Sequence, residues 1–164
     1  CGVMLSDKNG SNIMKYITVL IGILFLTGCS SNGNVNKRAY VRGTAINGNT
    51  ITMSFYTDEE TLSVTAENFD TAKKEAELKI GKQIFTGHTE LILLGECNET
   101  EVLEYMLHEW KVPPSCRVVT NAYDGGQELK NHNTEKLSGA LDIAQEQGEL
   151  GKCDIVTVLS EYLN

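Results

Sequence analysis

The sequence lacks the short motifs that mark common enzyme classes. It contains no G-x-S-x-G nucleophile elbow, no H-E-x-x-H zinc motif and no C-x-x-C pair. Gly87 and the Gly125-Gly126 pair stand without the third glycine or the Lys-Ser/Thr that a phosphate-binding loop requires. We therefore predict that the protein is not an enzyme and that it binds no metal or cofactor.

Basic residues are also scarce. The chain of 164 residues carries 14 Lys and Arg against 22 Asp and Glu, a formal net charge of −8. This excess of negative charge repels the phosphates of nucleic acids and the surfaces of anionic lipids. We expect no nucleic-acid partner.

The apolar run Tyr16–Leu26 is too short to cross a membrane, because a spanning helix takes about 20 residues. It follows Lys15 and ends in Leu-Thr-Gly before Cys29, whose thiol can accept a diacylglycerol. The alternative is a buried core helix that happens to end in cysteine. We predict a lipoprotein signal peptide over 1–28, lipidation of Cys29 and a polar tether over 29–36. The lipid anchor would hold the mature protein on the extracytoplasmic face of the membrane.

Residues 1–13 do not fit a signal peptide, because they are polar and precede Met14. We interpret them as translated upstream sequence or the edge of a fragment, with the true start at Met14. If they are genuine, the apolar run is an internal anchor instead. Residues 37–164 are long enough for one globular domain.

The five cysteines do not form a complete disulfide framework. Cys1 and Cys29 belong to the leader and the lipidation motif, which leaves an odd number. Cys97 and Cys116 would lie at opposite ends of neighbouring parallel strands, about 15–20 Å apart and too far for a disulfide. We expect these two and Cys153 to be buried as small apolar residues.

Two runs rich in Thr, Ile and aromatic residues predict a β-hairpin over about 38–46 and 49–57. Asn47-Gly48 between them favours a type I′ turn, in which both central residues have positive φ. Strict alternation places two sets of residues on opposite faces of the first strand: Ala39, Val41 and Ala45, or Tyr40, Thr44 and Ile46.

A helix follows the hairpin after a polar connection at 58–63. Apolar residues at three- and four-residue steps predict that it begins between Thr65 and Asn68 and runs to about Ile80. Either Thr65 or Asn68 can cap its N-terminus, and Gly81 can end it.

A βαβ unit is predicted next, with strands at 90–95 and 116–122 and a helix over 99–110. Asn98 is expected to cap this helix, with Glu101 completing a capping box. The two strands should be parallel. We therefore predict an α/β fold (α+β possible), in which the hairpin and the βαβ unit share one mixed sheet with helices packed on it.

The C-terminal part is predicted to be helical. The Gly125-Gly126 pair should open a loop, and Thr134 should cap a helix that stops near Gly148. Asp154 should cap a last helix, with Ile155, Val158, Leu159 and Tyr162 facing inward.

A few polar residues allow a functional interpretation beside a structural one. His88 is either a base or ligand, or a turn residue bonded to backbone. Arg38 and Arg42 share one strand face and either meet a partner's acidic surface or are simply exposed. An acidic cluster consists of Glu96, Glu99, Glu101 and Glu104. Either two or three of these residues bind a cation, or the cluster accompanies a helix N-terminus, where the dipole favours it.

The order of segments resembles the Ger(x)C family, the lipoprotein C subunits of bacterial spore germinant receptors. The lipidation motif is followed by N-K-R-A-Y-V-R-G-T-A-I at 36–46, by F-T-G-H at 85–88 and by L-I-L-L-G-E at 91–96. Three further segments resemble later parts of the family's first domain: Leu103–Glu109, Val118–Leu129 and Asp154–Leu163. The resemblance covers the family's N-terminal domain only.

This resemblance implies a non-enzymatic subunit in nutrient-triggered spore germination. Its partners would be the integral-membrane A and B subunits of a germinant receptor, in the cell membrane or the spore inner membrane. The alternative function is an extracytoplasmic lipoprotein that binds a small ligand, which would need a deep pocket with convergent polar groups.

Overall fold

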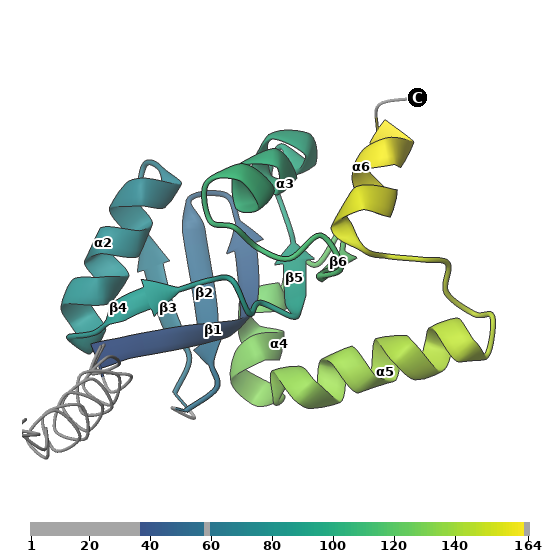
Figure 1. The fold of residues 1–164 in the computed structure, drawn as a ribbon, viewed down its shortest axis with the longest axis horizontal. Helices are drawn as coiled ribbons and strands as arrows, with labels where there is room; N and C mark the ends of the chain where they lie inside the picture. The colour runs from purple at the N-terminus through teal and green to yellow at the C-terminus, as the bar shows by residue number, and fades with distance from the viewer. Residues whose placement is uncertain (1–36, 58–59, 163–164) are drawn as a thin grey trace, which may run out of the picture. The chain divides into compact units, whose positions relative to one another are not determined.

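The computed structural model describes residues 37–57 and 60–162. They form a mixed sheet of six strands in the order β3-β2-β1-β5-β6, with β4 paired to β1 (Figure 1). The predicted α/β class, with helices packed on one mixed sheet, is confirmed. The elements along the chain are β1 (Arg38–Asn47), β2 (Thr50–Phe55), β3 (Leu62–Thr65), α2 (Phe69–Ile80), β4 (Gln83–Phe85), β5 (Leu91–Leu94), α3 (Glu99–His108), β6 (Arg117–Val119), α4 (Gly125–Asn131), α5 (Thr134–Glu146) and α6 (Ile155–Tyr162).

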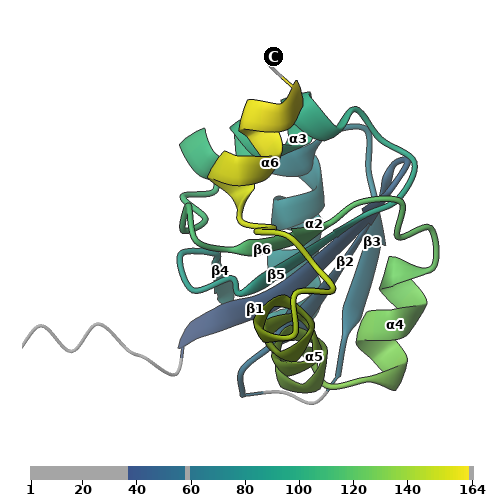
Figure 2. The ribbon, with the colours of Figure 1, turned by 90° about the vertical axis from the view of Figure 1, so that its right-hand side faces the viewer.

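Helices cover both faces of the sheet. Figure 2 shows α2, α3 and α6 on one side and α4 and α5 on the other. The first side holds the larger apolar core, to which Ile92, Leu103 and Met106 contribute without measurable exposure. The second side holds a small cluster of four buried residues: Ala45, Leu91, Leu93 and Leu129.

The predicted hairpin is confirmed, but its turn lies one residue later than expected. Asn47 pairs with Thr50, so Gly48 and Asn49 form the turn. Of these two, only Gly48 has positive φ, at 54°. Glycine at the first central position is typical of type II′ and not of the predicted type I′. Asn47 stays in the strand because its side chain accepts a hydrogen bond from Glu96 N at 3.0 Å.

The βαβ unit is confirmed. Strand β5 lies parallel to both β1 and β6, and all four of its residues are buried, as expected for an interior strand. Asn98 caps α3 by accepting from Glu101 N at 3.4 Å. In α2 it is Asn68, and not Thr65, that caps the N-terminus, while Gly81 ends the helix in the left-handed conformation.

Three local predictions are wrong. The connection predicted at 58–63 overlaps β3 (Leu62–Thr65), an edge strand that pairs with β2 and buries Val64. The Gly125-Gly126 pair begins α4 and does not open a loop. The cap of α5 is Asn133, which accepts from Glu135 N, because Thr134 is already helical and its hydroxyl bonds to Ser54.

The first strand also departs from strict alternation. Between Val41 and Gly43 the register with β2 shifts by one residue, which is a β-bulge. Val41 and Ile46 therefore share the larger core, while Ala45 belongs to the cluster on the opposite face. The predicted grouping of Ala45 with Ala39 and Val41 is wrong.

The three cysteines among the described residues are free, in agreement with the prediction that Cys97 and Cys116 do not pair. Cys116 and Cys153 are buried, whereas Cys97 is only half-buried. Cys29, the signal peptide and the tether lie outside the described residues. Within the described ranges, no helix combines the length and hydropathy needed to cross a membrane.

Candidate functional site

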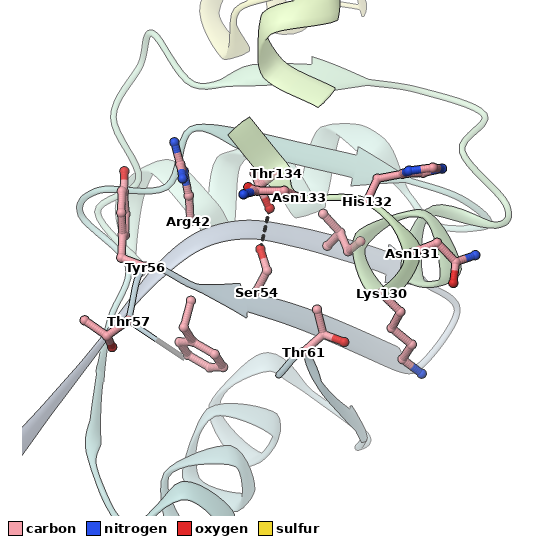
Figure 3. A pocket seen from close by; sticks show the side chains of 12 residues that line it. Arg42, Ser54, Tyr56, Thr57, Thr61, Lys130, Asn131, His132, Asn133 and Thr134 are labelled. Carbon is pink, nitrogen blue, oxygen red and sulfur yellow. Dashed lines mark hydrogen bonds between the residues drawn. The ribbon is translucent and has the colours of Figure 1, made fainter. Parts of the chain in front are cut away.

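A polar cavity of about 500 Å³ lies where β1 and β2 meet the turn between α4 and α5 (Figure 3). Strand β2 contributes residues from one wall, and the turn contributes His132, Asn133 and Thr134 from the other. The full lining is Arg42, Ser54, Phe55, Tyr56, Thr57, Thr61, Leu129, Lys130, Asn131, His132, Asn133 and Thr134. Its volume is in the range of small-molecule sites, although its lining is more polar than most of them.

Arg42 is the central charge of this cavity. It is the extra residue of the β-bulge, and bulges commonly re-aim a side chain. Its Nε donates to Glu90 Oε2 at 2.9 Å, and its Nη1 donates to Glu135 Oε2 at 3.2 Å. The guanidinium also lies 5.0 Å from the centre of the Tyr56 ring, within the range of a cation–π contact. The guanidinium of Arg42 thus links β1 to the residue before β5 and to the first turn of α5, which are distant in sequence.

Burial and the carboxylates both act on the pKa values of this network. Burial alone lowers the pKa of Arg42, but the bonds and charges of Glu90 and Glu135 outweigh that effect and raise it. Burial and the bond from the Tyr56 hydroxyl to Glu90 Oε1, 2.9 Å long, raise the pKa of Tyr56 to about 12. Arg42 is therefore charged and Tyr56 neutral at physiological pH.

The hydroxyls of Ser54 and Thr134 form the floor of the cavity. Their oxygens lie 2.6 Å apart, and Ser54 Oγ also donates to the carbonyl of Gly43 at 3.3 Å. Gly43 permits this approach, because a Cβ there would lie 2.8 Å from Thr134 Oγ1. The first turn of α5 is therefore locked onto β1.

Arg42 and Tyr56 are thus bonded to carboxylates outside the lining, and Ser54 and Thr134 are bonded to each other. His132, the histidine of the lining, lies 3.6 Å from Glu128 as a partly exposed pair and not beside Ser54. This arrangement suits a structural junction, or a site for a small polar ligand that exchanges hydrogen bonds with the rim. It does not present a hydroxyl activated by a base.

The other polar residues singled out in the sequence do not form one site with the cavity. The His88 ring packs against Tyr40 and Phe85, with centroids 5.9 and 5.4 Å away, and its backbone carbonyl accepts from Tyr56. Arg42 is paired, whereas Arg38 is exposed. The two arginines therefore do not act as one exposed face.

Two of the four acidic residues of the cluster around α3 accept hydrogen bonds from neighbouring side chains. Glu101 accepts from the Asn98 amide at 3.3 Å, and Glu99 accepts from the hydroxyl of Tyr162. Among the described residues, no group of three or more His, Cys, Asp or Glu side chains could hold a metal ion.

The sequence reasoning missed Glu90, Glu135 and Tyr56. Glu90 and Glu135 are 48 and 93 residues away from Arg42 along the chain. No local pattern links residues so far apart, so only the fold reveals the network.

Comparison with models of known protein families, with curated proteins and with solved structures gives no match to this chain. The residues of the chain itself are therefore the evidence on its function.

Proposed function

We propose that this chain is a lipid-anchored, non-enzymatic subunit of a spore germinant receptor, acting through protein–protein contacts at the membrane. The observation that carries the proposal is the lipidation motif ending at Cys29, followed after a short polar tether by a folded domain that begins with β1 at Arg38. The order of segments that resembles the Ger(x)C family runs through that same domain. The integral-membrane A and B subunits would be the partners.

The chemistry of the domain supports a role in assembly. In the polar cavity between β1, β2 and the turn before α5, Arg42 is bonded to Glu90 and Glu135, and Ser54 is bonded to Thr134. Burial raises the pKa of the Cys116 thiol, which keeps it protonated and unreactive. Such groups stabilise a rigid module more readily than they attack a substrate.

Exposed apolar side chains support contact with other proteins. Among the described residues, four of the eight exposed large apolar side chains lie on α5, α6 and the connection between them: Ile143, Leu150, Val156 and Tyr162 are 54, 37, 55 and 46% exposed. A hollow at β6 is lined by Leu141, Leu150 and Tyr162. A contiguous apolar surface around this hollow would be typical of one that a partner covers.

Mass spectrometry of the protein extracted from membranes tests the anchor. We expect a mature chain that begins at Cys29 and carries a diacylglycerol. The variant Cys29→Ala should retain the leader and lose the lipid. A bare thiol at Cys29 in mature wild-type protein would contradict the proposal. Co-purification with the A and B subunits in mild detergent, lost when Ile143 is replaced by Glu, tests the receptor role.

The alternative function, a lipoprotein that binds a small ligand, is favoured by the 500 Å³ cavity alone. A ligand bound there would contact Arg42. Calorimetric titration with small polar metabolites, in the wild type and in Arg42→Met, separates the two functions. Saturable heat that the variant loses would favour the ligand-binding protein.

A further inference from the structure

The charges of the chain are distributed unevenly. Residues 37–82 carry seven Lys and Arg and seven Asp and Glu, whereas residues 83–164 carry five and fourteen. The negative charge of the domain therefore belongs almost entirely to its C-terminal two thirds. Figure 1 shows that the start of β1, β4 and α2 lie at one end of the domain, away from α5 and α6.

A basic surface with an apolar centre lies at that N-terminal end. We call it the anchor-end patch, and it consists of Lys37, Arg38, Lys74, Leu78 and Lys82. Parallel pairing of Arg38 with Gln83 brings the start of β1 beside the end of α2. All of these residues except Arg38 line one hollow, and Leu78 is 83% exposed, the most exposed large apolar side chain of the described residues.

The only acidic residue of that hollow is turned toward the protein. Glu77 Oε1 accepts a hydrogen bond from the backbone N–H of Ile84 at 2.9 Å, which ties its carboxylate to β4. Lys37, Lys74 and Lys82 line the same hollow as Leu78. An apolar side chain among lysines is the composition that binds the headgroup region of an anionic bilayer.

The tether restricts where this patch can be. Lys37 follows Cys29 by eight residues, which span at most about 29 Å when fully extended. An acyl anchor on Cys29 therefore keeps the patch close to the bilayer at all times. The acidic remainder of the domain is repelled by an anionic surface, so charge orients the domain with this end toward the lipid.

We propose that the anchor-end patch lies on the anionic phospholipid headgroups of the leaflet that holds the anchor, with Leu78 at the apolar boundary. The proposal rests on the lipid anchor of the proposed function. It differs from the expectation from net charge, because the basic patch, and not the average charge of the chain, would meet the lipid. The C-terminal end would then face away from the membrane.

Quenching of tryptophan by brominated lipids tests this orientation. The mature lipidated chain is reconstituted into vesicles of brominated phosphatidylcholine, with or without phosphatidylglycerol, as Leu78→Trp and as Ile143→Trp. Both sites are exposed, and the native Trp110 is buried and serves as a common background. We expect Trp fluorescence at position 78 to be quenched about twofold more strongly with phosphatidylglycerol than without it, and position 143 to be unaffected.

Charge reversal supplies the matched control. Lys37→Glu with Lys74→Glu in the Leu78→Trp background should abolish the preference for phosphatidylglycerol. Lys130→Glu with Lys136→Glu, an equal change of charge outside the patch, should leave it intact. Salt at 0.5 M should also remove the preference, because the screening length falls well below the 10 Å of 0.1 M salt.

The outcomes separate the patch from the anchor. A chain that does not float with vesicles of either composition contradicts the lipid anchor, and the patch with it. A chain that floats but shows equal quenching at positions 78 and 143, or no dependence on phosphatidylglycerol, overturns the patch alone.

Discussion

Replacement of Gly43 by Ala should destabilise the domain by about 1–3 kcal/mol, the usual range for overpacking. The new Cβ would lie 2.8 Å from Thr134 Oγ1, 2.9 Å from Thr134 Cγ2 and 2.9 Å from Ser54 Oγ. These distances are shorter than carbon tolerates. Thr134 is only 3% exposed, so it cannot rotate into solvent. The first turn of α5 must therefore move away from β1.

A double-mutant cycle identifies the clash. Thr134→Ala alone should cost about 1 kcal/mol, because it removes the hydrogen bond to Ser54. In the double variant with Gly43→Ala, the added methyl group occupies space that Thr134 has left. We expect the combined loss to be smaller than the sum of the single losses by about 1 kcal/mol, a coupling typical of residues in contact.

Urea unfolding followed by Trp110 fluorescence measures these changes, because this side chain is 3% exposed in the folded protein. A loss of about 1.5 kcal/mol moves the midpoint by roughly 1 M urea at an ordinary slope. Gly139→Ala is the matched control: it lies inside α5 with open space around it, so it should stabilise by about 0.5–1 kcal/mol. An unchanged midpoint for Gly43→Ala, or strict additivity in the cycle, would refute the reasoning.

Two further predictions concern titratable groups. Hydrogen bonds from Thr157 lower the pKa of Asp154 below 3.8 in the folded protein. The stability that this cap contributes is therefore present above that pH and is lost as the pH falls through the lower folded value. Asp154→Ala should cost about 1 kcal/mol at pH 7 and nearly nothing at pH 2, which urea midpoints at the two pH values measure. Iodoacetamide at pH 8 should modify half-buried Cys97 well before Cys116, whose pKa burial raises much further, and mass spectrometry at timed intervals measures the order. Equal rates would mean that the segment at Cys116, just before β6, opens often.

The elements that the sequence predicted well are those with strong local signals. Leu91–Leu94 is a short, wholly apolar run, and it became the interior parallel strand β5. Asn68 and Gly81 fixed both ends of α2, because a side-chain acceptor and a left-handed residue are what helix ends require. For such elements, the conformation that the local sequence favours is also the conformation in the fold.

The missed elements depend on distant contacts. Glycine disfavours a helix by about 1 kcal/mol per residue, so Gly125-Gly126 predicted a loop. In the structure a Cβ at position 125 would lie 2.8 Å from the Cβ of Leu93, and one at 126 would lie 2.9 Å from Thr52 Oγ1. The pair thus lets α4 pack directly on the sheet, and that tertiary gain offsets the poor propensity. Strand β3 was missed for a similar reason, since Val64 is its only fully buried residue and pairing with β2 defines it.

The candidate site was invisible for a reason that concerns β1 itself. Strict alternation places Arg42 on the same face as Arg38, as a residue that meets a partner or is exposed, and gives no link to Glu90 or Glu135. One extra residue between Val41 and Gly43 breaks the alternation, because two residues of β1 advance while β2 advances by one. Residues before and after the bulge consequently exchange faces. Arg42 is the residue at which this exchange occurs, and its side chain meets Glu90 and Glu135 there. The site and the failure of the alternation rule therefore have a single cause.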